Sequence, residues 1–340
     1  MKVKNAKTAK VSSKAPNKKR SSLTNFDLAF SAEKKKGPGF SRDEFQEAYV
    51  PNGELSLYVK YNHTASESPN RPTLLFVHGY PDDHTTWSYQ MEALSDKFNV
   101  AACDLRGSGK SSKPKEQKAY NVRRMMEDLE KVIQFIGNNK PVHLVAHDWG
   151  AVICWAFIAD SKYSKWVTSY TAMGCPHPVL ATKAMFRLLL SFNPIHWWKA
   201  FRQSIRSFYI IVFQIPWLPQ WIWSTFSFRV WQLAMTMGGV PKKDPLRLKT
   251  REKILSSSIS TLNLYKELVR GERFPEIQQI KIPVQVLIPI RDFALSPECY
   301  TLHSGICESY TEHKIDCNHW IQRIFPQYVS EKILEHVRSV

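Results

Sequence analysis

An aspartate stands where the chain passes sharply from an apolar run into a buried helix. Asp148 lies in the stretch 142–150, between a β-branched segment that ends at Ala146 and a helical segment that begins at Ala151. The small residues Ala146 and Gly150 on either side are typical of a nucleophile elbow, whose tight turn tolerates little side-chain bulk. A carboxylate at this point can attack a saturated carbon and form an alkyl ester, which suits epoxides and alkyl halides. The alternative is that Asp148 only caps the helix.

Asp292 and His319 could complete this chemistry, because each follows a predicted strand. Asp292 comes shortly after the apolar stretch 282–288, and His319 comes after the stretch 309–315. Nucleophile, acid and histidine in this order are typical of α/β hydrolases. We expect Asp148 to attack the electrophilic carbon, and His319 to take a proton from the water that hydrolyses the ester. Asp292 would orient the imidazole and stabilise its charged form.

A loop that could stabilise an oxyanion follows another predicted strand. The apolar segment 73–77 runs directly into the segment 78–81. We expect the backbone N–H groups of Tyr80 and Trp149 to hold the oxyanion as the ester hydrolyses, with Gly79 allowing the backbone to approach closely. A simple turn is the alternative explanation of the same loop.

The elements that carry these residues alternate along the chain. Apolar strands are predicted at 98–103, 142–146 and 166–172, and an amphipathic helix at 120–136. This alternation predicts an α/β fold, with a mostly parallel central sheet and helices on both faces.

The regular alternation is interrupted once, and this interruption divides the chain. We predict a disordered basic tail at 1–40, an α/β-hydrolase core made of 41–177 and 276–340, and an inserted helical cap at 178–275. The cap is dense in aromatic residues, which we expect to form the wall of an apolar pocket. Polar residues and prolines interrupt its most apolar part, 208–223, well short of the about 20 residues of a membrane span.

Composition narrows the classes of function. The 340-residue chain is 43% hydrophobic, enough for one large domain with an insertion, and carries a net charge of +17. Residues 1–40 hold eleven Lys or Arg against Asp27 and Glu33, which accounts for +9. The rest has no zinc spacing or helix-turn-helix pattern, so we expect no nucleic-acid partner. The tail could anchor the protein to an anionic membrane or could be a solvated extension, and both roles stay open.

Cysteine usage and the N-terminus indicate a reducing compartment. The six cysteines are scattered without a CxxC pair, and no apolar segment typical of a secretory signal begins the chain. We therefore expect reduced thiols and a cytoplasmic protein, with membrane association on the cytoplasmic side as a further option.

Several motifs resemble those of α/β-hydrolase-fold epoxide hydrolases. They are His78-Gly79-Tyr80-Pro81, Asp104-Leu105-Arg106-Gly107-Ser108-Gly109, His147-Asp148-Trp149-Gly150 and Asn318-His319-Trp320. The resemblance runs from about residue 46 to the end, includes Phe213-Gln214-Ile215-Pro216 in the cap, and is closest to the animal epoxide hydrolase 4-like group. His147 favours epoxide hydrolases over haloalkane dehalogenases, which more often have Gln before the nucleophile.

The resemblance also implies a cap tyrosine that protonates the departing epoxide oxygen. Asn263-Leu264-Tyr265-Lys266 matches the family segment that carries one such donor, so Tyr265 is the expected donor. A second tyrosine normally precedes the Phe-Gln of the cap motif, where this chain has Val212. Tyr209, one helical turn earlier, either serves as the second donor or packs within the cap.

The leading hypothesis is an epoxide hydrolase for small apolar epoxides, lipid-derived ones included, that uses no cofactor and no metal. Peripheral membrane contact through the tail or the cap is a further option. A dehalogenase with the same Asp148 ester chemistry stays open, with Trp149 and a cap residue such as Trp197 holding the halide. A non-enzymatic ligand-binding protein on the same scaffold also stays open, and Val212 favours it mildly.

Overall fold

The computed structural model describes residues 45–340 except 273, 276 and 278. The predicted disordered tail at 1–40 and its role as an electrostatic anchor lie outside these residues. All six cysteines lie within the described part of the chain, and all are free thiols.

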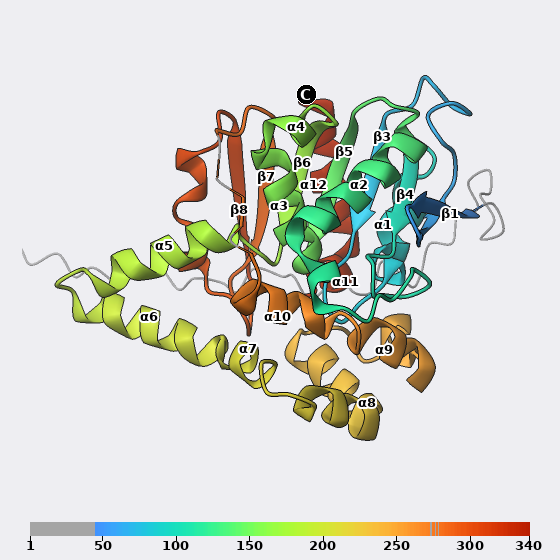
Figure 1. Ribbon diagram of the computed structural model, residues 1–340. Helices are drawn as coiled ribbons and strands as arrows, with labels where there is room; N and C mark the ends of the chain where they lie inside the picture. Colours follow the sequence, from blue (N-terminus) through green and yellow to red (C-terminus); the bar gives the residue numbers. More distant parts are fainter. Residues whose placement is uncertain (1–44, 273, 276, 278) are drawn as a thin grey trace, which may run out of the picture. The chain divides into compact units, whose positions relative to one another are not determined.

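Within the described residues, a central sheet of eight strands organises the molecule (Figure 1). Its strands lie in the order β1-β2-β4-β3-β5-β6-β7-β8. β2 pairs antiparallel with both β1 and β4, and the six strands from β4 to β8 pair in parallel. The strands are β1 (Gln46–Asn52), β2 (Leu55–Tyr61), β3 (Thr73–Val77), β4 (Asn99–Cys103), β5 (Val142–His147), β6 (Val167–Met173), β7 (Val284–Pro289) and β8 (Tyr310–Ile315). The prediction of a mostly parallel α/β sheet is confirmed.

Helices cover both faces of the sheet, which explains why the central strands are continuously apolar. In β3, Leu75 and Val77 face a core shared with α2 and α3, whereas Leu74 and Phe76 face a core shared with α1 and α12. These helices and their short companions are α1 (Ser88–Leu94), α2 (Val122–Gly137), α3 (Trp149–Ala159), α4 (Ser161–Ser164), α11 (Ile321–Ile324) and α12 (Pro326–Arg338), with η3 (His84–Trp87), η4 (Gln117–Tyr120), η6 (Pro297–Tyr300) and η7 (His303–Gly305).

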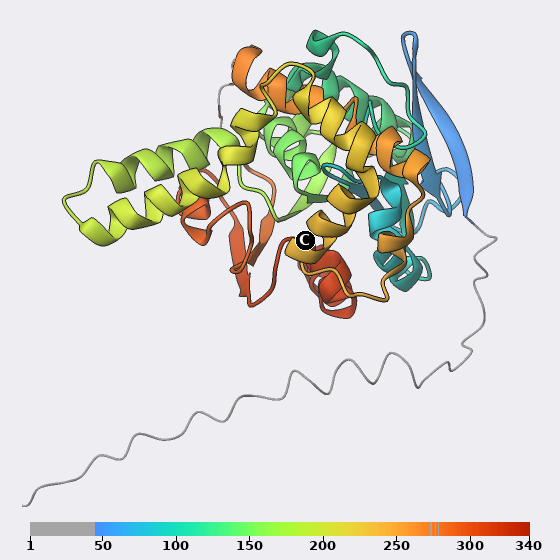
Figure 2. The ribbon, with the colours of Figure 1, turned by 90° about the horizontal axis from the view of Figure 1, so that it is seen from below.

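The segment between β6 and β7 is helical, and we call it the cap. Its helices lie below the sheet in Figure 1 and cross in front of it in Figure 2. They are α5 (Pro178–Leu189), α6 (Pro194–Arg206), α7 (Phe208–Val212), α8 (Leu218–Met237), η5 (Pro245–Leu248), α9 (Arg251–Ser258) and α10 (Leu262–Arg270). In the part of the chain that the structure describes, no helix is both long enough and apolar enough to cross a bilayer.

Candidate active site

The elbow between β5 and α3 holds Asp148 in a backbone conformation that is rare for a residue with a side chain. Its φ is 52° and its ψ is −122°, a strained combination that persists only where the surroundings enforce it. A Cβ on Gly150 would collide with the carbonyl oxygen of Val77, and a Cβ on Gly79 would collide with the Asp148 carboxylate. Glycine at both positions therefore lets the elbow and the loop after β3 come together.

The Asp148 carboxylate faces that loop and does not cap α3. Asp148 occupies the N-cap position, but its side chain accepts no hydrogen bond from the first turn of the helix. Its Oδ1 instead accepts the backbone N–H of Tyr80 at 2.6 Å. The helix-cap alternative is therefore wrong. The N–H of Trp149 belongs to the first turn of α3, where backbone N–H groups have no helical partner.

His319 lies between Asp148 and Asp292. Its Nδ1 is 2.7 Å from Asp292 Oδ2, and its Nε2 is 3.6 Å from Asp148 Oδ2. Asp292 is itself fixed, because its Oδ1 accepts the backbone N–H groups of Ala294 at 2.7 Å and Leu295 at 3.3 Å. The structure thus brings together the three residues that the sequence placed after separate strands.

The two carboxylates set the charge of the imidazole. Burial alone would lower the pKa of His319, but Asp292 and Asp148 outweigh burial and raise this pKa to about 10. Burial would raise the pKa of Asp148, yet the neighbouring His319 keeps it below its ordinary value. Both shifts favour an imidazolium between two carboxylates in the resting site.

His147 supports the backbone of His319 and remains neutral. Burial lowers the pKa of His147 to about 4. Its Nε2 lies 3.0 Å from the His319 carbonyl oxygen, so this nitrogen carries the proton and donates it. The residue before Asp148 thus holds the loop that carries the histidine.

A cavity of about 430 Å³ extends from Asp148 into the cap. Both tyrosines expected from the sequence, Tyr265 and Tyr209, line it together with Trp149. The ring of Tyr265 lies 5.0 Å from that of Trp149 and 5.7 Å from that of Tyr209, measured between centroids. Burial raises the pKa of both tyrosines, so each phenol is neutral and can donate a proton. Val212, which stands where the family has its second tyrosine, does not line this cavity as far as the structure describes it.

The cap motif 213–216 contributes to the site indirectly. Gln214 Nε2 donates to the carbonyl oxygen of Tyr265 at 2.9 Å, which ties the segment after α7 to α10. Phe213 and Tyr80 also pack edge-on against the Tyr265 ring, with centroids 4.9 Å and 5.1 Å away. Tyr265 is therefore held by aromatic contacts and by its own backbone.

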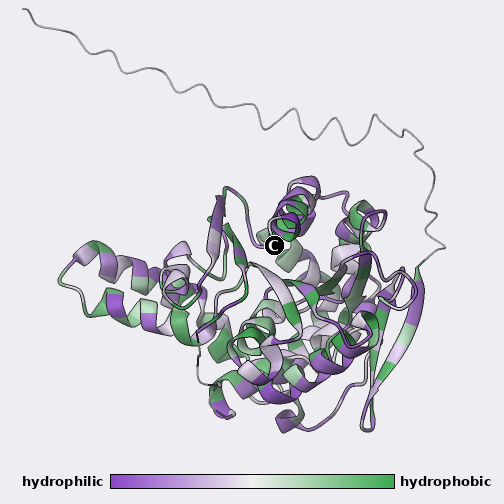
Figure 3. Cartoon of the chain, turned by 90° about the horizontal axis from the view of Figure 1, so that it is seen from above, coloured by the Kyte–Doolittle hydropathy of each residue, from purple (hydrophilic) through white to green (hydrophobic). Residues whose placement is uncertain are grey.

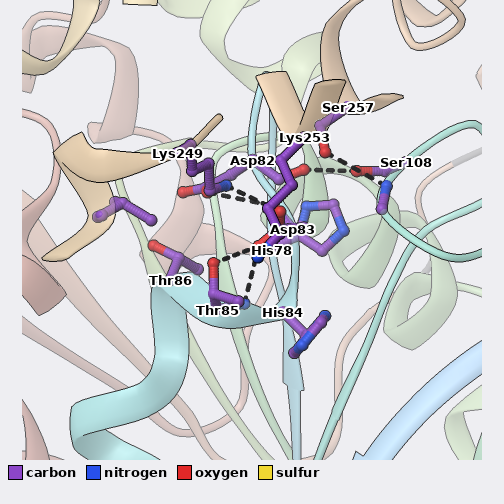
Figure 4. Close-up of polar contacts among 12 residues, drawn as sticks. His78, Asp82, Asp83, His84, Thr85, Thr86, Ser108, Lys249, Lys253 and Ser257 are labelled. Carbon is purple, nitrogen blue, oxygen red and sulfur yellow. Dashed lines mark hydrogen bonds and ion pairs between the residues drawn. The ribbon is translucent and has the colours of Figure 1, made fainter. Parts of the chain in front are cut away.

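Sequence reasoning missed a buried ion cluster that connects the cap with the site (Figure 4). Lys249 Nζ lies 2.8 Å from Asp82 Oδ1 and 2.9 Å from Asp83 Oδ2, and all three side chains are almost fully buried. Asp82 Oδ2 also accepts the indole N–H of Trp320, the residue after His319, at 3.1 Å. The cluster thus joins the loop after β3, the end of η5 and the histidine loop.

One expectation about aromatic residues in the cap is wrong, and a second holds for only part of the cap. The Trp197 indole N–H is bonded to the carbonyl oxygens of Leu189 at 3.1 Å and Ser191 at 2.6 Å, and Trp197 does not line the cavity with Asp148 as far as the described residues go. The cap aromatics Tyr209 and Tyr265 border the cavity as expected. The wall that α6 provides consists instead of Ala200, Gln203 and Ser204, and the aromatic residues of α6 are exposed.

Known proteins share this fold and this arrangement of elements. The sequence model of the α/β-hydrolase fold matches residues 72–204. Mouse Epoxide hydrolase 3 is 27% identical over 286 residues, which cover 79% of this chain and 71% of the mouse protein. Human Epoxide hydrolase 4 is 28% identical over 172 residues, which cover 51% of this chain and 43% of the human protein.

Further matches agree on the fold. A Mycobacterium tuberculosis protein named Probable oxidoreductase EphD is 25% identical over 269 residues, or 78% of this chain, but the match spans only 45% of that protein's length. The crystal structure of Bacillus megaterium epoxide hydrolase with an inhibitor has a TM-score of 0.68 at 24% identity, covering 85% of this chain and 99% of that one.

The strand order, the elbow and these matches define the class of the fold, which is the α/β-hydrolase fold. Within that class, its sequence is similar to those of proteins named Epoxide hydrolase 3 and Epoxide hydrolase 4, which agrees with the resemblance of its motifs.

Proposed function

We propose that the protein is an epoxide hydrolase that converts apolar epoxides to vicinal diols through an ester on Asp148. The observation that carries this proposal is the orientation of the Asp148 carboxylate. Its Oδ1 accepts the Tyr80 N–H, its Oδ2 lies 3.6 Å from His319 Nε2, and Asp148 lines the cavity. One oxygen is thus held by a backbone donor while the other is free to attack.

In the first step, Asp148 Oδ2 attacks an epoxide carbon, and the C–O bond of the three-membered ring breaks. A neutral tyrosine gives its proton to the departing oxygen, and Tyr265 and Tyr209 both border the cavity in which this happens. Aspartate has then become a neutral ester, and one of the two carboxylates that keep His319 protonated has lost its charge. The imidazolium proton is released and returns to the tyrosinate.

In the second step, neutral His319 takes a proton from water, and the hydroxide adds to the ester carbonyl. Asp292 stabilises the imidazolium that forms. The Tyr80 N–H, with that of Trp149, stabilises the oxyanion on the former Oδ1. Collapse of the tetrahedral species breaks the ester C–O bond, and the departing alkoxide takes the proton of the added hydroxyl group to give the diol. The Asp148 carboxylate is restored beside protonated His319, so the cycle consumes one water and no net proton.

The test is single-turnover mass spectrometry with styrene oxide and with a fatty-acid epoxide, comparing the parent chain with His319→Gln. The variant should accumulate an adduct of epoxide mass on the peptide that contains Asp148, while the parent releases diol. Asp148→Asn is the control that should show no adduct.

The same experiment separates the alternatives. Halide release from a bromoalkane, without any diol from the epoxides, would replace the proposal with a dehalogenase. Binding of the epoxide without an adduct in any variant would indicate a ligand-binding protein.

A further inference from the structure

The hairpin formed by α5 and α6 exposes apolar side chains that a helix pair normally buries. It extends away from the sheet in the views of Figures 1, 2 and 3. At its tip, Phe192 is 99% exposed and Leu190 is 79% exposed. Contiguous apolar surface of this kind marks an interaction site rather than ordinary solvent-facing surface.

The outer face of α6 is apolar, and its inner face is small and polar. Exposed apolar residues recur at intervals of three or four, so they form one stripe along the helix and into α7; they are Ile195, Trp198, Phe201, Ile205 and Phe208. The opposite face, which borders the cavity, carries Ala200, Gln203 and Ser204. A helix packed in water has the reverse arrangement. The medium outside α6 is therefore expected to be less polar than water.

The tip of the hairpin is held in a defined conformation. The Trp197 indole N–H donates to the carbonyl oxygens of Leu189 and Ser191, across the turn. Asn193 Oδ1 accepts the N–H of Ile195 at 2.9 Å and caps α6. The turn therefore presents Leu190 and Phe192 outward as part of the fold.

The positive charge of this part of the cap favours an anionic partner. Residues 178–243 contain eight Lys or Arg and neither Asp nor Glu. Lys183, Arg187 and Arg202 are exposed on the hairpin itself, beside its apolar residues. A second copy of this chain would bring one cationic face against another, whereas an anionic lipid surface is complementary.

We propose that this hairpin binds the surface of a bilayer that contains anionic phospholipid. Its tip and stripe would enter the boundary between headgroups and acyl chains, where tryptophan side chains are favoured, while the cations contact phosphates. The mode of binding is interfacial, in keeping with the absence of a membrane-spanning helix among the described residues.

The cavity connects this surface with Asp148. Ala181, Met185 and Leu189 line the cavity at helical spacing along the inner face of α5. From the first to the last of these residues the helix rises about 12 Å, and Leu189 is 52% exposed beside the tip. The hairpin therefore offers a path by which an epoxide on a lipid chain passes from the bilayer to the nucleophile. This second part of the inference rests on the proposed function.

The test is sedimentation of the full-length chain with vesicles of phosphatidylcholine, with and without phosphatidylserine. The hairpin variant carries Leu190→Ser, Phe192→Ser and Trp198→Ser. A control variant loses three apolar side chains that are exposed elsewhere, through Tyr49→Ser, Leu248→Ser and Val269→Ser. Both variants keep every basic residue of the chain, so the difference between them reports on apolar insertion by the hairpin.

We expect the parent and the control to bind vesicles with phosphatidylserine, and more weakly without it. The hairpin variant should bind at least about a hundredfold more weakly, because each lost side chain is worth roughly a factor of ten. Equal binding by the two variants would overturn the proposal. So would a parent chain that is dimeric in sedimentation velocity and becomes monomeric in the hairpin variant without binding vesicles.

A parallel activity assay keeps the membrane inference separate from the proposed function. The hairpin variant should hydrolyse dissolved styrene oxide at the rate of the parent and lose at least about tenfold on an epoxidised phospholipid in vesicles. If vesicle binding depends on the hairpin but the chain opens neither epoxide, the proposed membrane binding stands and the proposed epoxide hydrolase function is refuted.

Discussion

Removing the charge of the proposed nucleophile should lower the pKa of His319. The relevant atoms, His319 Nε2 and Asp148 Oδ2, lie 3.6 Å apart. At this distance a unit charge pair is worth about 1 to 5 kcal/mol for an effective dielectric constant between about 80 and 20. Since 1.36 kcal/mol corresponds to about one pH unit, Asp148→Asn should lower the pKa of His319 from about 10 by about one to three pH units.

The assay is an NMR titration of the histidine rings, in which the His319 signal is identified by its loss in His319→Gln. Asp316→Asn is the matched control, because Asp316 lies near His319 in sequence but is exposed and paired with Arg291. The control should leave the His319 titration where it is in the parent. An unchanged pKa in Asp148→Asn, or a parent value near 6.5, would refute the imidazolium between two carboxylates and the proton cycle built on it.

Three further results are expected. Lys249→Met should lower the free energy of unfolding by about 3 to 5 kcal/mol, because two buried carboxylates lose their cation. Burial would raise the pKa of Asp82, but the attraction of Lys249 outweighs burial and lowers this pKa. The stability that the Asp82–Lys249 pair contributes is therefore complete above about pH 4 and is lost as the pH falls further. Denaturation at several pH values should show this loss. Tyr209→Phe should slow ester formation in stopped-flow by about tenfold or more, because a proton donor is lost from the cavity. Val212→Tyr should not raise the rate of ester formation, because position 212 does not border the cavity in the described structure. Gly79→Ala should abolish turnover while the chain remains folded by circular dichroism, because the added methyl group would occupy the place of the Asp148 carboxylate.

The core could be read from the sequence because parallel strands covered on both faces leave continuous apolar runs. The predicted strand 73–77 has the bounds of β3, and the predicted strand 309–315 differs from β8 by one residue. Asp148 and His319 were found for a related reason, since the ends of such strands meet at one edge of the sheet. Lys249 could not be found in this way. Its partner Asp82 is 167 residues away, and no local pattern distinguishes a lysine that is buried from one in solvent.

In the cap, the sequence predicts the helices but not which of their faces is buried. Periodicity identifies α6 as a helix with an apolar stripe, but it does not say what lies beside that stripe. The expectation that the aromatic residues of the cap form the wall of the pocket holds for Tyr209 and Tyr265 but not for the aromatic residues of α6. In the structure Trp198 and Phe201 point outward, and Gln203, from the polar face, is buried and donates to the carbonyl oxygen of Ala294 at 2.8 Å. A buried glutamine satisfied by a backbone acceptor costs little, so α6 can place its polar face inside. The free energy that would normally come from burying the stripe is then available to an external partner, and the proposed binding of this face to a membrane surface rests on that.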